Sequence, residues 1–391
     1  MPPLSAAAGS LRSRATFAFH DQVKKMEAAG RSIIHFELGE PDAVTPPHIV
    51  DAAVAALRRG ETHYTGKDSL SQAITQATQS ELGFTPTREQ VVIAPAVSFL
   101  YTVIRCAANP GDEVIIPAPA YPTYASVCRF QSVRPVPVAA REENGFRLDP
   151  ADVAAACTEK TRVVVINSPC NPTGAVMTAD EVRALSELCT ERGIYLLSDE
   201  TYAQLCFDTP FSSPAAVDGC RSSTVMVRSF SKTYAMTGWR LGWGVGPAPL
   251  MEKVGQLLQM IISTVPPFIQ EAGAAALTQG GAWVSRQVTG YRQRRDAIVA
   301  GLGKIPGVTC VKPAGALYAF PNITGTGMTS AEFVEAALQR ANVALLPGTA
   351  FGPAGEGYVR LCFATSLANC QEGILRLQRA FGAQDQAGRE G

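Results

Sequence analysis

Short apolar runs alternate with stretches of helical periodicity between residues 90 and 227. The runs are rich in Val and Ile, which is the composition expected of strands buried on both faces of a parallel sheet. Predicted strands occupy residues 90–93, 113–116, 134–138, 162–166, 195–198 and 224–227. Because helical stretches separate most of these runs, the pattern predicts a doubly wound α/β core with helices covering the sheet.

The two ends of the chain show a different pattern. Helical periodicity covers residues 21–29, 47–59 and 69–82 near the N-terminus. Strand-like segments are residues 33–38, 308–312, 315–320 and 358–363. Helical segments dominate past residue 270, so we expect the last three of these strands to form a separate small sheet.

The length of 391 residues exceeds one comfortable hydrophobic core and suggests two domains. We expect a large domain over residues 48–280. A discontinuous small domain would combine residues 13–47 and 281–391, after an N-terminal tail of residues 1–12.

Composition and charge narrow the expected partners. Lys plus Arg and Asp plus Glu both number 34, which favours neither a nucleic acid nor an anionic membrane surface. The ten cysteines include no Cys-x-x-Cys pair and only four histidines accompany them, so neither a metal site nor a disulfide framework is expected. The chain shows no signal-peptide pattern and no apolar run near the roughly 20 residues of a membrane helix. We therefore expect a cytoplasmic protein with a small neutral or zwitterionic ligand.

Polar residues follow three consecutive predicted strands. Asn171 lies in the turn after the fourth strand, Asp199 and Tyr202 follow the fifth, and Lys232 follows the sixth. Ligands of open parallel sheets bind outside the carboxyl ends of the strands, so we expect these side chains to converge. Each also has an ordinary interpretation, because Asn-Pro forms turns, Asp caps helices, Tyr packs and lysine is usually a surface residue.

The same four residues together suit a pyridine aldehyde. A carboxylate such as Asp199 can pair with a ring nitrogen and keep it protonated, which makes the ring an electron sink. Asn171 and Tyr202 can both reach a ring oxygen and lower the basicity of an imine, and Lys232 can form that imine. The pattern indicates covalent carbonyl chemistry on a ring cofactor.

Four segments, in order along the chain, carry a family resemblance. They are Leu38-Gly-Glu-Pro-Asp42, Ser168-Pro-Cys-Asn-Pro-Thr-Gly174, Ser198-Asp-Glu-Thr-Tyr202 and Ser229-Phe-Ser-Lys-Thr-Tyr-Ala-Met-Thr-Gly-Trp-Arg-Leu-Gly242. From about residue 17 to about residue 377 the chain resembles the class I and II aminotransferases, which are fold type I pyridoxal-phosphate-dependent enzymes. The resemblance implies a mainly parallel seven-stranded sheet in an α/β/α sandwich, a smaller α+β domain, and pyridoxal 5'-phosphate as cofactor.

The resemblance also implies roles for individual residues around the cofactor ring. Lys232 would be the Schiff-base lysine and the proton shuttle, and Asp199 would pair with the pyridine nitrogen. Asn171 and Tyr202 would bind the phenolic oxygen, and Tyr121 would stack on the ring face.

Further residues are expected around the phosphate and the substrate. Backbone amides at a helix start would share the phosphate with nearby side chains. Residues expected at the phosphate are Val97, Ser98, Ser229, Ser231 and Arg240. Arg360 would bind the substrate α-carboxylate beside Gly39 and Asn171, because a forked guanidinium matches a carboxylate. Tyr64 would reach the phosphate of a neighbouring subunit, which implies a homodimer with sites at the interface.

Three positions depart from the family pattern. Ala96 stands where the family usually has Gly, so either the local backbone avoids a positive φ or the phosphate sits differently. The loop after Tyr64 is shorter than usual, and Ser71 stands where the family commonly has Arg. These changes leave the substrate less determined than the cofactor.

The leading hypothesis is ping-pong transamination between an L-amino acid and a 2-oxo acid. No second arginine for a distal carboxylate stands out, which favours a neutral or aromatic side chain and leaves aspartate open. The same fold also supports elimination, γ-replacement or cyclisation. A pyridoxal-phosphate-binding regulator is a further alternative, although the N-terminal residues form no basic cluster for DNA.

Overall fold

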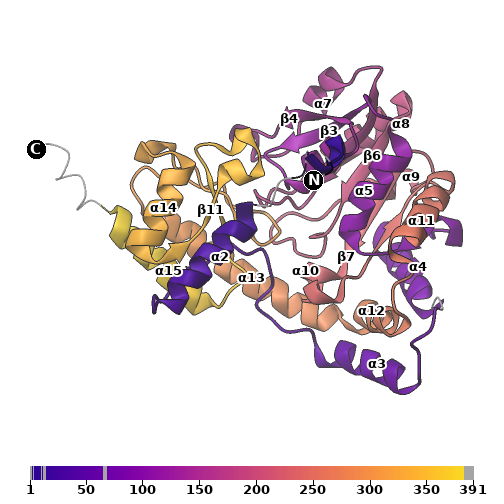
Figure 1. Cartoon of the computed structure of the whole chain (residues 1–391), viewed down its shortest axis with the longest axis horizontal. Helices are drawn as coiled ribbons and strands as arrows, with labels where there is room; N and C mark the ends of the chain where they lie inside the picture. The colour runs from indigo at the N-terminus through magenta and orange to yellow at the C-terminus, as the bar shows by residue number, and fades with distance from the viewer. Residues whose placement is uncertain (1, 3, 10, 12–14, 65–67, 383–391) are drawn as a thin grey trace, which may run out of the picture.

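A seven-stranded sheet forms the centre of the computed structural model, which describes residues 2, 4–9, 11, 15–64 and 68–382 (Figure 1). In spatial order the strands are β2 (Val91–Ile93), β8 (Gly242–Val245), β7 (Thr224–Ser229), β6 (Tyr195–Asp199), β5 (Thr161–Asn167), β3 (Glu113–Ala118) and β4 (Arg134–Ala139). Only β8 runs antiparallel to its neighbours in this sheet. The six predicted strands and the mainly parallel sheet are confirmed, whereas β8 was not predicted.

The sheet is buried on both faces because side chains alternate along each strand. On β5, Val163 and Val165 point to one face, and Val164 and Ile166 point to the other. The first face is covered by α5 (Ala96–Ala107), α6 (Thr123–Phe130) and α11 (Ala248–Ile262). The second face is covered by α3 (Pro47–Arg58), α4 (Asp68–Leu82), α7 (Pro150–Ala156), α8 (Ala179–Arg192), α9 (Ala215–Asp218) and α12 (Pro267–Gln279). The result is the expected α/β/α sandwich.

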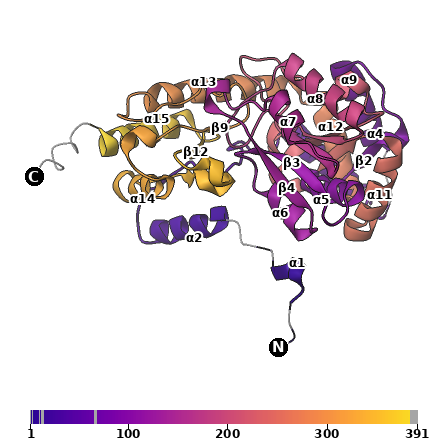
Figure 2. The ribbon, with the colours of Figure 1, turned by 90° about the horizontal axis from the view of Figure 1, so that it is seen from above.

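A second hydrophobic core lies beside the sandwich and joins both ends of the chain (Figures 1 and 2). Its helices are α2 (Ala15–Ala28), α13 (Gly281–Leu302), α14 (Ser330–Ala341) and α15 (Leu367–Phe381). Strand β1 (Ile34–His35) pairs in parallel with β10 (Val343–Ala344). A three-stranded antiparallel sheet contains β11 (Leu346–Pro347), β12 (Val359–Cys362) and β9 (Tyr318–Ala319).

The small sheet differs from the sequence prediction. Residues 308–312 form no strand and contribute one isolated bridge, from Thr309 to Asn322. Pro313, which has no N–H to donate, follows this segment directly and limits further pairing. The predicted strands 315–320 and 358–363 shorten to β9 and β12, and the two-residue strands β10 and β11 were not predicted.

Near the N-terminus, the predicted helices 47–59 and 69–82 are confirmed as α3 and α4, and the predicted helix 21–29 begins earlier, as α2. Within the predicted tail 1–12 lies the short helix α1 (Ala6–Gly9), and the unusually short loop after Tyr64 falls outside the described residues. No helix among the described residues is long and apolar enough to cross a membrane. The same residues contain no cluster of His, Cys, Asp and Glu that could hold a metal ion. The domain boundaries remain a prediction.

Candidate active site

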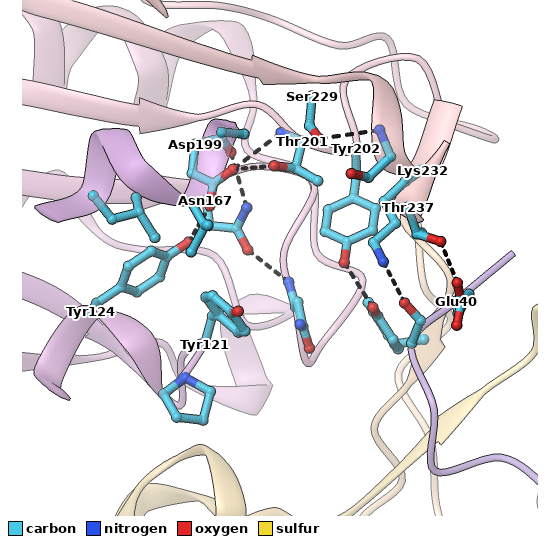
Figure 3. Close-up of a pocket in the computed structure, with 18 of the residues that line it drawn as sticks. Glu40, Tyr121, Tyr124, Asn167, Asp199, Thr201, Tyr202, Ser229, Lys232 and Thr237 are labelled. Atoms are coloured by element: carbon cyan, nitrogen blue, oxygen red, sulfur yellow. Dashed lines mark hydrogen bonds between the residues drawn. The ribbon is translucent and has the colours of Figure 1, made fainter. Parts of the chain in front are cut away.

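A cavity of about 370 Å³ opens at the carboxyl ends of β5, β6 and β7 and faces the small sheet (Figure 3). It lies next to the point where the strand order reverses, since β4 and β5 flank β3 on opposite sides. Eleven predicted site residues line this central cavity. They are Gly39, Val97, Tyr121, Asn171, Asp199, Tyr202, Ser229, Ser231, Lys232, Arg240 and Arg360.

Lys232 lies in the single-turn helix α10 (Phe230–Thr233), directly after β7. Ser229 caps this turn by accepting a hydrogen bond from the Ser231 amide at 3.2 Å, which fixes where the lysine leaves the backbone. The Lys232 Nζ donates to the Gly39 carbonyl oxygen at 2.6 Å. Burial lowers the pKa of the Lys232 ammonium below its ordinary value. A buried amine of this kind can serve as a nucleophile and a proton carrier.

Asp199 ends β6 with its carboxylate in the cavity wall (Figure 3). Its Oδ2 accepts from the Tyr124 hydroxyl at 2.7 Å, and its Oδ1 accepts from the Thr201 hydroxyl at 2.7 Å and the Thr201 amide at 3.2 Å. Burial raises the pKa of the Asp199 carboxyl, and these hydrogen bonds act against that rise. A carboxylate has about four acceptor positions, so one remains for a donor in the cavity.

Asn171 and Arg360 meet although they lie 189 positions apart. The Asn171 amide nitrogen of the backbone donates to the Asn167 Oδ1 at 2.8 Å, which places the Asn171 side chain over the sheet edge. Arg360 donates to the Asn171 Oδ1 at 3.1 Å and to the Glu37 carbonyl oxygen at 2.6 Å. The side-chain amide nitrogen of Asn171, Nδ2, is thereby left to donate to another group.

The Arg360 guanidinium is buried between two aromatic rings. Its Cζ lies 4.5 Å from the centre of the Tyr318 ring and 4.8 Å from that of the Phe351 ring. Phe351 ends the 3₁₀ turn η5 (Gly348–Phe351), and Arg360 is 4% exposed. The Nε has no hydrogen-bond partner within the described part of the chain. A buried, oriented and incompletely paired guanidinium is suited to a planar anion such as a carboxylate.

Tyr202 contributes a phenol to the same wall. Its hydroxyl lies 2.7 Å from the Tyr318 hydroxyl, and the two rings pack edge to face with centres 5.7 Å apart. Burial raises the pKa of the Tyr202 phenol well above its ordinary value, so the group is neutral at physiological pH. It can therefore donate a hydrogen bond to an oxygen in the cavity.

The start of α5 and the turn after β7 also contribute residues to the cavity wall. Ala96 is the first helical residue of α5, which shows that the local backbone avoids a positive φ at this departure from the family pattern. Val97 and Arg240 also line the cavity, and Arg240 donates to the Thr237 carbonyl oxygen at 2.7 Å. Helix-start amides, hydroxyls and a guanidinium together favour an anion.

Two predicted site residues, Ser98 and Tyr64, are not among the residues that line the cavity, and neither is Ser71, which departs from the family pattern. Ser98 is not in the wall, and its hydroxyl donates to the Pro95 carbonyl oxygen at 2.6 Å. Tyr64 is 87% exposed within one chain. Ser71 lies within α4, outside the cavity wall.

Several wall residues were missed in the sequence. Tyr124, Asn167, Thr201, Tyr318 and Phe351 all line the cavity. Asn167 and Thr201 stand at or just after strand ends, so the strand-end argument could have found them. Tyr318 and Phe351 come from the small sheet and its neighbouring turn, and no pattern in the sequence links those segments to the large sheet.

Comparison with known proteins identifies the fold and the family. The chain is 38% identical to an aspartate aminotransferase from Pyrococcus horikoshii, over 92% of this chain and 93% of that protein. It is 39% identical to an arginine–pyruvate transaminase from Pseudomonas aeruginosa, with coverage of 89% and 90%. The structure of aspartate aminotransferase from Thermus thermophilus with maleate superposes with a TM-score of 0.92 at 32% identity, covering 97% of this chain and all of that one.

A family model described as aminotransferase class I and II matches residues 31–377. That range includes every residue that lines the cavity, from Leu38 to Arg360. This chain therefore belongs to the class I and II aminotransferases and is an enzyme of that family.

Proposed function

We propose that this aminotransferase holds pyridoxal 5'-phosphate in the central cavity and moves an amino group between an L-amino acid and a 2-oxo acid. The observation that carries the proposal is the convergence of the Lys232 amine, the Asp199 carboxylate and the Arg360 guanidinium in one cavity. These groups suit covalent attachment of an aldehyde, pairing with a ring nitrogen, and binding of a carboxylate.

The residues of the cavity suit each edge of the cofactor. Asp199 retains one acceptor position for the protonated ring nitrogen, and Tyr202 and the Asn171 amine can donate to the ring oxygen. Tyr121 offers a flat side chain to the ring face. Lys232 would hold the cofactor through its Nζ.

The phosphate would lie between the start of α5 and the turn after β7. Ser229 and Ser231 offer hydroxyls there, Arg240 offers a guanidinium, and the Val97 amide belongs to the first turn of α5. Ser98 stays a predicted phosphate ligand through its position in that first turn. Together these groups would neutralise the phosphate charge.

When bound, the cofactor supplies an electron sink that accepts the electron pair left on the substrate Cα when its bond to hydrogen is broken. Arg360 would bind the substrate carboxylate through its unpaired Nε edge, beside Gly39. Lys232 Nζ, with its lowered pKa, would accept the proton from Cα and later return a proton. The residue therefore changes from an anchor to a base during each half of the reaction.

We propose a neutral or aromatic amino acid as the preferred donor. The cavity wall includes the apolar side chains of Leu38, Val97, Leu100, Pro122 and Phe351. Among the described wall residues the cations are Lys232, Arg240 and Arg360, and the proposal uses each of them for another group. Relatives named for aspartate, arginine and aromatic substrates indicate that this scaffold accepts different side chains.

We propose a homodimer that pairs through an apolar groove beside the cavity. This apolar groove is lined mainly by Val44, Val50, Trp239, Phe268 and Ile269. Val44 is 84% exposed within one chain, and the groove shares Glu40 and Thr237 with the cavity wall. A second copy on this face would cover the apolar side chains and bring its own Tyr64 toward the phosphate.

Two further proposals concern the whole chain. We propose the domain division at residues 48–280, with residues 13–47 and 281–391 as the small domain. Three hydrophobic cores lie almost wholly within residues 48–280, and a fourth consists mainly of residues from the two small-domain segments. We also propose a cytoplasmic location, which the ten free cysteines support because a reducing compartment preserves thiols.

A screen of single amino acids tests the proposed reaction. The protein would be purified with pyridoxal 5'-phosphate and mixed with one amino acid at a time, and the absorbance of the bound cofactor would be followed. An amino acid that acts as a donor should remove the absorbance band of the protein-bound cofactor and yield one equivalent of its 2-oxo acid per bound cofactor. Release of free ammonia without that conversion would instead support elimination chemistry.

A further inference from the structure

Tyr318 links the two groups of residues that the proposed function uses. It lies on β9 of the small sheet, is 1% exposed, and lines the central cavity. Its hydroxyl lies 2.7 Å from the Tyr202 hydroxyl, and its ring lies under the Arg360 guanidinium at 4.5 Å. One side chain therefore contacts the expected ligand of the cofactor oxygen and the expected ligand of the substrate carboxylate.

The two phenols form a hydrogen bond in which only one can donate. Burial raises the pKa of both phenols, so each carries its single hydrogen at neutral pH. If Tyr202 donated to Tyr318, it would have no hydrogen left for an oxygen in the cavity. If Tyr318 donates instead, Tyr202 accepts one bond and can direct its own hydrogen into the cavity, where the accepted bond also strengthens it as a donor.

We infer that Tyr318 is a positioning residue for transamination, whose hydroxyl donates to Tyr202 and whose ring fixes the plane of Arg360. The inference rests on the proposed function, because it assigns Tyr202 to the cofactor oxygen and Arg360 to the substrate carboxylate. Tyr318 acts through these two residues: the hydroxyl sets the direction of one proton, and the ring sets the orientation of one cation.

Gly39 provides an independent observation. A Cβ atom at this position would lie 2.3 Å from the Tyr318 hydroxyl oxygen and 3.1 Å from two carbons of its ring. The missing side chain is therefore what allows the Tyr318 hydroxyl to occupy its place next to Tyr202. A phenylalanine at position 318 would remove the shortest of these contacts and keep the ring.

The first experiment compares Tyr318→Phe, Tyr202→Phe and wild type, each loaded with pyridoxal 5'-phosphate, by titrating the cofactor absorbance with pH. A donated hydrogen bond stabilises the deprotonated form of the bound chromophore, so losing it should raise the titration midpoint. We expect Tyr318→Phe to raise the midpoint by about half a pH unit. Tyr202→Phe should raise the midpoint further.

The matched control is Tyr291→Phe, because Tyr291 is also 1% exposed and its hydroxyl has no hydrogen-bond partner in the described structure. Its midpoint should equal that of wild type. An unchanged midpoint in Tyr318→Phe, or an equal shift in Tyr291→Phe, overturns the positioning inference. Failure of wild type to show any cofactor absorbance overturns the proposed function instead.

Substrate kinetics separate the two roles of Tyr318. Tyr318→Phe keeps the ring under Arg360, so the KM for the amino donor should stay within about twofold of wild type while kcat falls. Tyr318→Leu removes the ring as well and should raise KM roughly tenfold. Equal KM values for the two variants would contradict the role of the ring.

The second experiment needs no cofactor. Gly39→Ala should lower the melting temperature, because its methyl group collides with the Tyr318 hydroxyl. The double variant Gly39→Ala/Tyr318→Phe should recover most of that loss, since the closest remaining contacts are 3.1 Å. Additive effects of the two substitutions would show that they do not share this contact, and would overturn the packing argument.

Discussion

Lys232 is partly buried and, among the residues that the structure describes, forms no ion pair with a carboxylate, a combination that is rare in a lysine. Its Nζ donates a hydrogen bond to a backbone carbonyl, that of Gly39, so this contact does not neutralise the charge of the ammonium. Loss of hydration then favours the neutral amine, which is the form that attacks a carbonyl and accepts a proton. At the residue scale, the proposed chemistry depends on this lysine, whose neutral amine form is favoured.

Replacement of Lys232 by Ala should abolish the cofactor absorbance that borohydride can fix to the protein, because no amine remains to hold the aldehyde. The measurement is absorbance and protein mass after reduction. Lys253→Ala is the control, since Lys253 is 60% exposed and paired on the surface with Glu252. Persistence of a reducible band in Lys232→Ala would mean that another lysine holds the cofactor.

Replacement of Asp199 by Ala should leave the cofactor attached and lower kcat by roughly 100-fold or more, because a buried charge next to the ring is lost. Single-turnover kinetics with saturating amino donor would measure the effect. Thr201→Val removes only one of the hydrogen bonds to Asp199 and should lower kcat by about tenfold or less. A kcat for Asp199→Ala near that of wild type would disprove the assignment of the carboxylate.

Residues at strand ends were the predictable part of the site. Asn171, Asp199 and Lys232 follow consecutive parallel strands, and the geometry of such a sheet brings strand ends together. Tyr124 and Tyr318 could not be predicted in the same way. Their roles depend on how a helix and a second sheet pack against the first, and local sequence does not encode that packing.

At the scale of elements, a buried ion pair joins the ends of β6 and β7 behind the cavity. Arg228 Nε lies 2.9 Å from the Glu200 carboxylate, and both side chains are almost completely buried. Glu200 is the residue after Asp199, and Arg228 is the residue before Ser229. The ion pair therefore fixes the distance between β6 and β7 next to Asp199 and Ser229, which line the cavity. Arg228 also pairs with Glu81 at the end of α4.

Arg228→Met should lower the free energy of unfolding by about 3 kcal/mol or more, because it leaves the Glu200 carboxylate buried without its cation. Urea unfolding would measure the loss. The exposed pair Lys253–Glu252 provides the contrast, since Lys253→Ala should cost less than about 1 kcal/mol. The double variant Arg228→Met/Glu200→Leu should recover part of the loss, and a further loss in that variant would contradict the argument.

A second ionic contact joins α2 to β1. His35 on β1 lies between the Glu37 carboxylate at 2.8 Å and the Glu27 carboxylate at 2.9 Å. The hydrogen bond to Glu37 is the main reason that the pKa of His35 rises to about 9, with smaller help from Glu27 and against the effect of burial. Because the folded pKa is the higher one, this stabilisation is complete below pH 6.5 and is lost as the pH rises to 9.

His35→Gln should therefore lower the free energy of unfolding at pH 6 by roughly 1–2 kcal/mol after allowance for solvent screening, and by much less at pH 10. Urea unfolding at pH 6, 8 and 10 would measure this. Glu27→Gln should show a weaker form of the same pH dependence. Parallel pH profiles for wild type and His35→Gln would rule out the effect.

Six strands of the large sheet followed from apolar runs, because each of these runs contains at least two Val, Ile or Leu residues and could be recognised alone. The strands β1, β9, β10 and β11 have two residues each, too few for a period of two to be visible. Strand β8 contains two glycines, Gly242 and Gly244, which weaken strand propensity. Space requires Gly242, since a Cβ there would lie 2.6 Å from the Arg228 carbonyl oxygen and 2.9 Å from the Ala96 nitrogen.

At the scale of the whole molecule, the central cavity lies between two sheets that belong to different hydrophobic cores. The apolar groove continues from its edge along α3 and the start of α12. Helix α3 lies at the bottom of Figure 1. The exposed side chains of Val44 and Tyr64 suit an interface between two copies.

Val44→Glu should convert the proposed dimer to a monomer, because a charge would enter the apolar groove. It should also weaken cofactor retention, because the Tyr64 that the second copy contributes to the site would be lost. Light scattering and the cofactor content after gel filtration would measure both effects. Leu375→Glu is the matched control, since Leu375 is 40% exposed and lies on α15, a helix that packs against the other core. An unchanged mass for Val44→Glu would exclude this face as the interface.

The pairing of β1 with β10 has a consequence for biosynthesis. A ribosome that has reached residue 245 has made every strand of the large sheet, so this part can collapse early. Ile34 cannot pair with Val343 until almost the entire message has been translated, and Arg360 is added later still. A prematurely terminated chain would therefore contain Lys232 and Asp199 but lack the carboxylate-binding side of the cavity, and would bury neither β1 nor the residues around Gly39.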